Sequence, residues 1–278
     1  MENRLKQINK EINGATVVWQ RFFEKKIKEL AGGIDMNNIF VACQDENCLY
    51  SINEKGSIIW KIDAEGSIKK IKTSIEGKVL VFISNDTSLW CVDRAGIVLW
   101  KVKLGEIIDV CISGSGNVVA CSFFDENKKP KLALFSKSGY SLWQKNVENI
   151  IEKISMSFDG GAIICSSGKK VEQYTKVGER TWSSTLPSNV KQIAVASSGL
   201  LIYVLADALY SISPAGKERW KISIPGGSIS SVAISSDGFV NVGYTGREGN
   251  RVFRYDVRGE LLWKHLSPED VDIIRMAY

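Results

Sequence analysis

The feature that most constrains the fold of this chain is a tryptophan that returns at intervals of about 40 residues. In each of six copies, a glycine lies four residues before the tryptophan. The tryptophans are Trp60, Trp100, Trp143, Trp182, Trp220 and Trp263, and the glycines are Gly56, Gly96, Gly139, Gly178, Gly216 and Gly259. A period of this length indicates a repeat protein in which each copy is one supersecondary unit.

The rest of each repeat predicts four β-strands, which we call A to D in chain order. Strand D carries the tryptophan, and about eleven residues later strand A carries an apolar residue that we call the anchor. The anchors are Ile71, Val110, Ile154, Ile193, Val232 and Ile274, and the first five are followed after six residues by Gly77, Gly116, Gly160, Gly199 and Gly238. Short runs rich in Val, Ile, Tyr and Trp, bounded by Gly, Ser, Asn and Asp, are typical of strands.

Four-stranded units of this period, arranged radially, make a β-propeller. Strand A is apolar on both faces, as in residues 110–112 and 232–234, which fits a sheet covered on both sides by like sheets. We therefore predict an all-β fold, a seven-bladed β-propeller of four-stranded antiparallel blades, forming one domain over residues 1–278.

The closing blade is expected to be shared between the two ends of the chain. Trp19 continues the tryptophan series, so residues 1–30 are predicted to supply strands C and D, and residues 271–278 a strand A. Such sharing closes the ring and removes exposed sheet edges. Strand B of this blade is missing, so either the blade is incomplete or the chain is part of a longer one. An alternative interpretation makes residues 21–30 an amphipathic helix and leaves six blades plus an N-terminal arm.

The composition is that of an ordinary globular protein, with 44% hydrophobic residues and a net charge of +5, which excludes wholesale disorder. The basic residues are scattered among carboxylates, so we expect neither nucleic acid nor a membrane as partner. The apolar runs are too short to cross a bilayer, and the first twenty residues contain no apolar signal region. Most of the six cysteines lie in apolar stretches, as free thiols do in a reducing compartment. We therefore expect a cytoplasmic protein; a disulfide between Cys43 and Cys48 is the open alternative.

Residues 93–100 (DRAGIVLW) and 256–263 (DVRGELLW) resemble the Asp-x-x-Gly-x-x-x-Trp repeat of quinoprotein-like (PQQ-like) β-propellers. The resemblance covers essentially the whole chain and implies that each tryptophan docks between adjacent blades. The PQQ-dependent dehydrogenases of that superfamily are longer and eight-bladed, with an adjacent Cys-Cys pair against the quinone and carboxylates that hold calcium. No two cysteines are adjacent here, so we expect no cofactor. Outer-membrane assembly lipoproteins share the repeat but are exported, which we do not expect of this chain.

The sequence offers little catalytic chemistry. His265 is the single histidine, so any nucleophilic triad would have to use it. Cys43 and Cys48 lack a second pair at metal-ligand spacing. The glycine-rich segments 113–116 and 225–227 lack the Lys-Ser/Thr ending of a phosphate-binding loop. We therefore predict no catalytic, cofactor-binding or metal-binding residues.

The B–C loops vary in length and sequence, and variable loops on a rigid scaffold are where recognition usually occurs. Residues 123–130 form the longest predicted loop and 245–250 the second longest. The sequence favours a non-enzymatic scaffold that binds a protein partner on the face carrying these loops, through Phe123, Phe124, Lys128, Lys129 and Arg247. The alternative is a small-ligand sensor or a hydrolase or lyase-type enzyme with carboxylates at the channel mouth, namely Glu65, Glu106, Glu148 and Asp270. A third interpretation is self-assembly through the incomplete blade.

Overall fold

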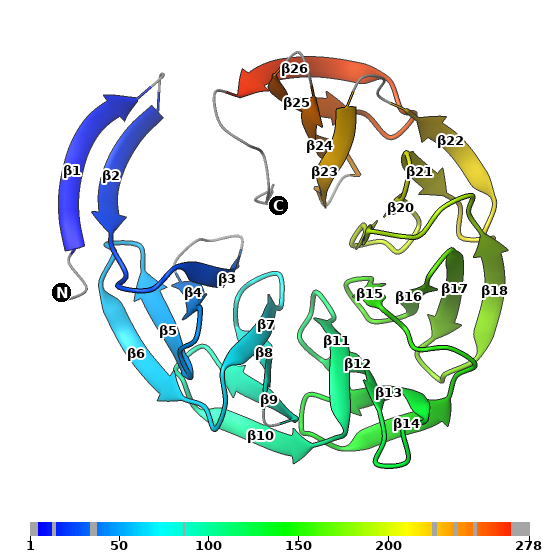
Figure 1. The fold of residues 1–278 in the computed structure, drawn as a ribbon, viewed down its shortest axis with the longest axis horizontal. Helices are drawn as coiled ribbons and strands as arrows, with labels where there is room; N and C mark the ends of the chain where they lie inside the picture. Colours follow the sequence, from blue (N-terminus) through cyan, green and yellow to red (C-terminus); the bar gives the residue numbers. More distant parts are fainter. Residues whose placement is uncertain are drawn as a thin grey trace.

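The structure is a computed structural model that describes residues 5–12, 15–33, 38–85, 87–223, 227–235, 238–246 and 249–267. Within these ranges the chain forms six four-stranded antiparallel sheets, the blades, arranged radially around a central axis (Figure 1). In each blade the strands follow chain order from the inner strand A to the outer strand D, as predicted. The propeller fold and the four-stranded repeat are therefore confirmed.

The strands of blades 1 to 3 are β3 (Ile27–Gly32), β4 (Asn38–Cys43), β5 (Cys48–Asn53), β6 (Ile58–Asp63), β7 (Ile68–Thr73), β8 (Val79–Ser84), β9 (Ser88–Asp93), β10 (Val98–Lys103), β11 (Glu106–Ile112), β12 (Val118–Phe124), β13 (Pro130–Ser136) and β14 (Ser141–Asn146). Those of blades 4 to 6 are β15 (Lys153–Met156), β16 (Ala162–Ser167), β17 (Lys170–Thr175), β18 (Arg180–Thr185), β19 (Gln192–Val195), β20 (Ile202–Leu205), β21 (Leu209–Ile212), β22 (Glu218–Ile222), β23 (Gly227–Ile234), β24 (Val240–Gly246), β25 (Asn250–Tyr255) and β26 (Leu261–Ser267).

Burial along the strands explains their composition. Every residue of β8 is buried, because strand B lies between two neighbouring blades and must be apolar on both faces. The outer strands alternate instead, so that β14 and β18 have partly buried residues at every second position, as expected of strands with one face in water. Five hydrophobic clusters fill the five interfaces between consecutive blades.

The repeated glycine and tryptophan meet across each interface between blades. The turn glycine of one blade packs against the indole of the preceding blade, as Gly139 does against Trp100. The glycine has a positive φ of 84°, which residues with a Cβ rarely adopt, and a Cβ built on it would lie 2.7 Å from the indole. The indole nitrogen of Trp100 donates a hydrogen bond of 2.8 Å to the Lys137 carbonyl two residues before the glycine. The docking of tryptophan between blades is thus confirmed for the five tryptophans that precede a further described blade, but not for Trp263.

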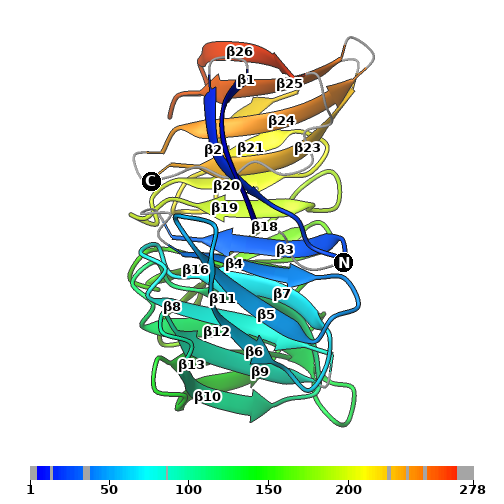
Figure 2. The same cartoon turned by 90° about the vertical axis from the view of Figure 1, so that its left-hand side faces the viewer.

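The predicted seven blades are not what the structure shows: the described residues form six, together with a two-stranded hairpin of β1 (Leu5–Ile12) and β2 (Ala15–Arg21). The two strands expected at the N-terminus are present and pair antiparallel, but β1 lies farther from the axis than β2 (Figure 1). Figure 2 shows the hairpin crossing in front of the gap between β26 and β3. The strand predicted over 271–278 lies outside the described residues. The helix of the alternative interpretation is wrong, because β3 occupies residues 27–32.

Blade 1 keeps a partly uncovered face where a seventh blade was expected. Its anchor is Leu30, eleven residues after Trp19. Leu30 is 42% exposed, whereas the equivalent Ile71 and Val110 are at most 2% exposed. On the other side of the gap, Trp263 of blade 6 is 43% exposed. A closed ring was predicted because the repeat spacing was extended to the ends of the chain. In the structure, the two strands of the hairpin do not cover the exposed faces of blades 1 and 6.

Candidate functional site

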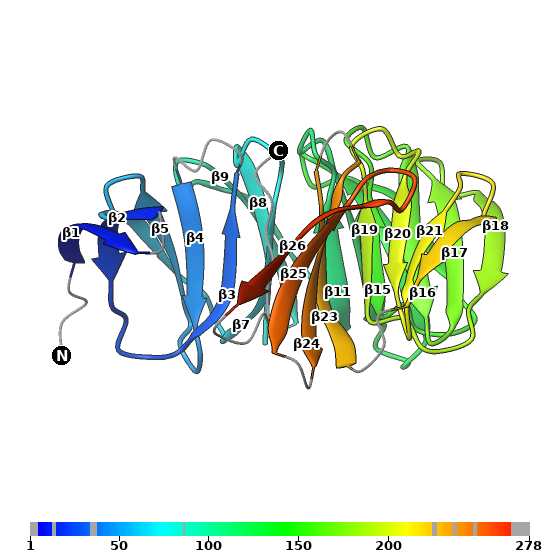
Figure 3. The ribbon, with the colours of Figure 1, turned by 90° about the horizontal axis from the view of Figure 1, so that it is seen from above.

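The propeller has two rims with different connections (Figure 3). We call the rim with the B–C loops and the D–A connections between blades the loop face, and the rim with the A–B and C–D turns the turn face. The antiparallel order of each blade places these two kinds of connection at opposite ends. Both rims therefore have to be searched for a site.

A central cavity of about 560 Å³ lies along the axis, surrounded by strand A of all six blades. Its lining runs from the anchors, such as Leu30 and Ile193, to the A–B turns, such as Ile75 and Phe158, so it belongs to the turn-face half of the channel. Most lining side chains are aliphatic, and the described lining contains no carboxylate. A volume of 300–1,000 Å³ is typical of small-molecule sites.

Three of the carboxylates predicted at the channel mouth each lie beside a different lysine. Glu65 pairs with Lys101, Glu106 lies 4.0 Å from the Lys128 ammonium, and Glu148 lies 3.3 Å from that of Lys170. None of the three lines the central cavity, and Asp270 lies outside the described residues. Each of these three follows a strand D in the chain and lies beside a lysine of a neighbouring strand or, for Glu106, of the B–C turn of blade 3.

The predicted partner-binding residues that the structure describes belong to the B–C hairpin of blade 3. Phe123 is 3% exposed and belongs to the cluster between blades 2 and 3, so its placement on the contact surface is wrong: alternation along β12 turns it inward. Phe124 is partly exposed, and Lys128 and Lys129 are exposed at the tip. Arg247 lies outside the described residues.

This hairpin is a fixed projection of the loop face. Asp125 closes the turn by accepting hydrogen bonds from the backbone of Asn127 and Lys129 at 2.9 and 2.8 Å, and these backbone bonds lower the pKa of its carboxyl. At its base, a Cβ on Gly105 would lie 1.6 Å from the Phe124 carbonyl oxygen, so the D–A connection packs directly on the hairpin. The loop is shorter than predicted, because β12 extends to Phe124 and β13 begins at Pro130, which leaves residues 125–129 as the turn.

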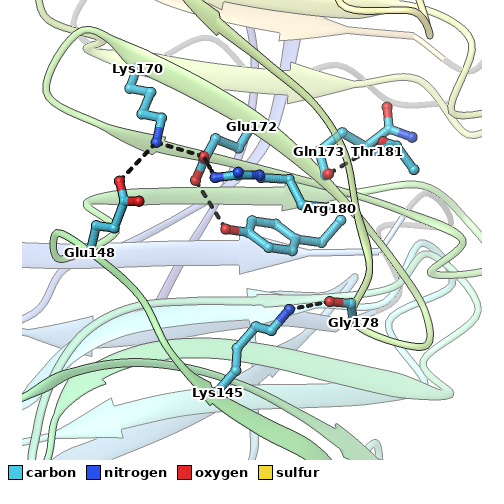
Figure 4. A network of polar contacts seen from close by, with 9 residues as sticks. Lys145, Glu148, Lys170, Glu172, Gln173, Gly178, Arg180 and Thr181 are labelled. Carbon is cyan, nitrogen blue, oxygen red and sulfur yellow. Dashed lines mark hydrogen bonds and ion pairs between the residues drawn. The ribbon is translucent and has the colours of Figure 1, made fainter.

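A second polar site was not foreseen from the sequence. A cavity of about 200 Å³ lies between β14 and blade 4, and charged side chains converge on it (Figure 4). At its centre is the carboxylate of Glu172, which the Lys170 ammonium and the Arg180 guanidinium each approach to 2.9 Å. The Tyr174 hydroxyl donates to the same carboxylate at 3.0 Å, and Lys145 donates to the Gly178 carbonyl.

The hydrogen bonds decide the protonation state of this cluster. Burial acts to raise the pKa of Glu172, but bonds from Lys170, Tyr174 and Arg180 outweigh it and lower the pKa. Burial and the neighbouring carboxylate raise the pKa of Tyr174. Glu172 is therefore a carboxylate with its acceptor sites occupied near neutral pH, which suits an ion-pair network better than a general base.

A comparison of the repeats reveals Glu172 as a departure from the pattern. Ten residues before the tryptophan, blades 1, 2, 5 and 6 carry Tyr50, Trp90, Tyr210 and Phe253. Blade 4 has Glu172 instead, and Tyr174 supplies the aromatic ring two positions later. The signal was present in the sequence, but only the structure shows that the carboxylate meets two cations.

Cysteine and metal chemistry can be stated for the part of the chain that the structure describes. All six cysteines are free thiols, and Cys48 donates from its Sγ to Asp63 at 3.1 Å, so the alternative of a Cys43–Cys48 disulfide is wrong. Among the same residues, no group of three or more His, Cys, Asp or Glu side chains is placed to hold a metal ion. No helix there is long and apolar enough to cross a lipid bilayer.

Fold and repeat together define a β-propeller of the PQQ-like repeat type. Residues 3–170 and 167–277 match the model of the PQQ-like repeat family described as outer membrane protein assembly factor BamB. The chain belongs to this family. Comparison with curated protein sequences finds no match.

Among solved structures, the chain is similar to the β-propeller domain of Cps50 (Swd1) from Myceliophteria thermophila, with a TM-score of 0.68. The sequences are 12% identical, and the similarity covers 89% of this chain and 88% of that domain. At this identity the likeness concerns the fold alone.

Proposed function

We propose that this chain is a non-enzymatic binding propeller that holds a protein partner on its loop face. A propeller is compatible with such a role, although a fold by itself does not define a function. The observation that carries the proposal is the rigid hairpin of blade 3, which presents a partly exposed aromatic ring beside two exposed lysines. Aromatic and cationic side chains on a preorganised support are typical of contact surfaces between proteins.

The length and the turn conformation of the hairpin fit a role in presenting its tip to a partner. Its strand β12 has seven residues, as does β24 of blade 6, whereas the B strands of the other four blades have six or four. Lys128 adopts a positive φ of 59°, a strained conformation that the turn bonds of Asp125 maintain. Order of this kind reduces the entropy lost when a partner binds.

The alternative of a ligand sensor or a hydrolase or lyase-type enzyme needs carboxylates that converge on a substrate. Glu65, Glu106 and Glu148 instead lie apart, each beside a lysine. Because reacting groups must lie within hydrogen-bond reach of one another, this arrangement favours binding over catalysis. We also propose a reducing compartment such as the cytoplasm, since the thiols are free and most are buried.

Site-specific photocrosslinking tests the proposal. A photoreactive amino acid replaces Lys129 on the loop face or, as the matched control, the exposed Lys55 of a C–D turn on the turn face. In cells of the native host, we expect a discrete crosslinked protein from position 129 and none from position 55. The double variant Lys128→Glu with Phe124→Ala should abolish that crosslink, and Lys55→Glu should leave it intact. A partner that crosslinks equally from both positions, or that survives the double variant, would refute the assignment of this surface.

A further inference from the structure

The outer strand of blade 6, β26, exposes more large hydrophobic side chains than the outer strand of any other described blade. Leu261, Leu262, Trp263 and Leu266 are 50%, 49%, 43% and 64% exposed. Each of the other five outer strands exposes at most two such side chains, and β18 and β22 expose none. A contiguous apolar patch of this kind on a protein surface marks a contact surface.

Comparison of the repeats shows that the blade does not need these leucines. The outer strands of all six blades pair with strand C in the same register, so their positions are equivalent. Three residues after the tryptophan, blade 6 carries Leu266 and the other blades carry polar residues, namely Asp63, Lys103, Asn146, Thr185 and Ser223. Directly before the tryptophan, Thr181 and Arg219 stand in blades 4 and 5 where Leu262 stands in blade 6. Because the same strand forms with polar residues, packing within the propeller does not explain the leucines.

The backbone of β26 also presents a free strand edge. It is the last strand of its sheet, and within the described residues its one strand partner is β25. Figure 1 shows β26 on the outside of the ring, beside the gap that precedes blade 1. Proteins protect such edges with charged side chains, as β22 does with Glu218, Arg219 and Lys221. β26 has only Lys264 as a permanent charge, so its edge is open to a further strand.

We propose that β26 is a dimerisation surface, at which the β26 of a second copy of this chain pairs antiparallel to the first across a two-fold axis. An antiparallel strand edge is complementary to itself, and an edge with one lysine offers little to a strongly charged partner. The two copies of blade 6 would form one continuous sheet. Because the patch is small, we expect a dissociation constant in the micromolar range.

This dimer goes beyond the protein-binding role proposed above. β26 belongs to blade 6, whereas the hairpin that carries that role belongs to blade 3. Either surface can therefore fail without the other.

Sedimentation velocity of the 278-residue chain from about 1 to 200 µM tests the dimer, because self-association depends on concentration. We expect the monomer to give way to a dimer over this range. Leu262→Arg should weaken the dimer about tenfold or more, because it places a charge in the apolar contact. Arg219 stands at the same position in blade 5, so the strand tolerates arginine there. The matched control Leu142→Arg, at the equivalent and 47% exposed position of blade 3, should leave the dissociation constant unchanged.

A second measurement uses the unmodified protein, so that the proposal stays testable even where Leu262→Arg fails to fold. In about 1 M NaCl the dimer should persist, because salt screens the repulsion between two copies of net charge +5 and does not weaken apolar contacts. A dimer that dissociates in high salt would show a charge-driven contact and overturn the proposal. A monomer at about 200 µM would leave the edge to a different protein, and equal weakening by Leu262→Arg and Leu142→Arg would place the contact elsewhere. Either result also overturns it.

Discussion

The contact between turn glycine and indole yields a quantitative prediction at Gly139. An alanine there would keep a left-handed conformation, which costs roughly 1 kcal/mol. Its Cβ would lie 2.7 Å from Cγ of Trp100 and 3.0 Å from Cβ, and overpacking of this kind typically costs about 1–3 kcal/mol. Gly139→Ala should therefore lower the free energy of unfolding by roughly 2–4 kcal/mol.

Gly168 provides the matched control, because it has a positive φ of 55° but its nearest atom to a new Cβ is Oδ1 of Asn189 at 3.7 Å. Gly168→Ala should lose only the conformational part, about 1 kcal/mol. Urea unfolding followed by both circular dichroism and fluorescence gives the two free energies, provided that the two transitions coincide.

The reasoning is refuted if Gly139→Ala is no more destabilising than Gly168→Ala. A double-mutant cycle sharpens the comparison. In a Trp100→Ala background Cγ and the ring are gone, so the added cost of Gly139→Ala should fall toward about 1 kcal/mol.

Three further predictions concern buried polar groups. Asp109, 3% exposed, accepts hydrogen bonds from Lys70 Nζ at 2.5 Å and from the Ile154 backbone at 2.8 Å; Asp109→Asn should cost roughly 3–5 kcal/mol of stability in urea unfolding, whereas Asp63→Asn in an exposed pair should change little. The pKa of Glu172 is lowered in the folded state, so its contribution to stability is present above the unfolded pKa of about 4.3 and is lost as pH falls through the folded value. Glu172→Gln should therefore flatten the curve of unfolding free energy against pH below about pH 4.5. An unchanged curve would contradict the ion-pair network. Burial raises the pKa of Cys43 to about 11 and of Cys91 to about 12, whereas Cys48 is only partly buried; mass spectrometry after brief alkylation should find Cys48 labelled first, and uniform labelling would contradict the packed cores.

The candidate functional residues were harder to predict from the sequence than the repeat, and individual residues show why. Phe123 and Phe124 are adjacent in sequence, and which of them faces water depends on the register of β12 against β11 and β13. Glu65, Glu106 and Glu148 follow their strands as predicted, but lysines distant in the chain decide that each has a cation beside it. Glu172 stands out only when the repeats are compared position by position.

The sequence by itself determined the blade: its four strands, its turn glycines with positive φ and its tryptophan contact. These depend on interactions between residues close in the chain, or on one contact repeated at every interface. Only the tertiary structure decided that the described residues complete six blades rather than seven, and that a cavity with a largely aliphatic wall lies in the turn-face half of the channel. Those properties depend on the angles at which whole sheets pack around the axis. Each angle is set at one interface between blades, and only all the interfaces together fix how many blades fit around the axis.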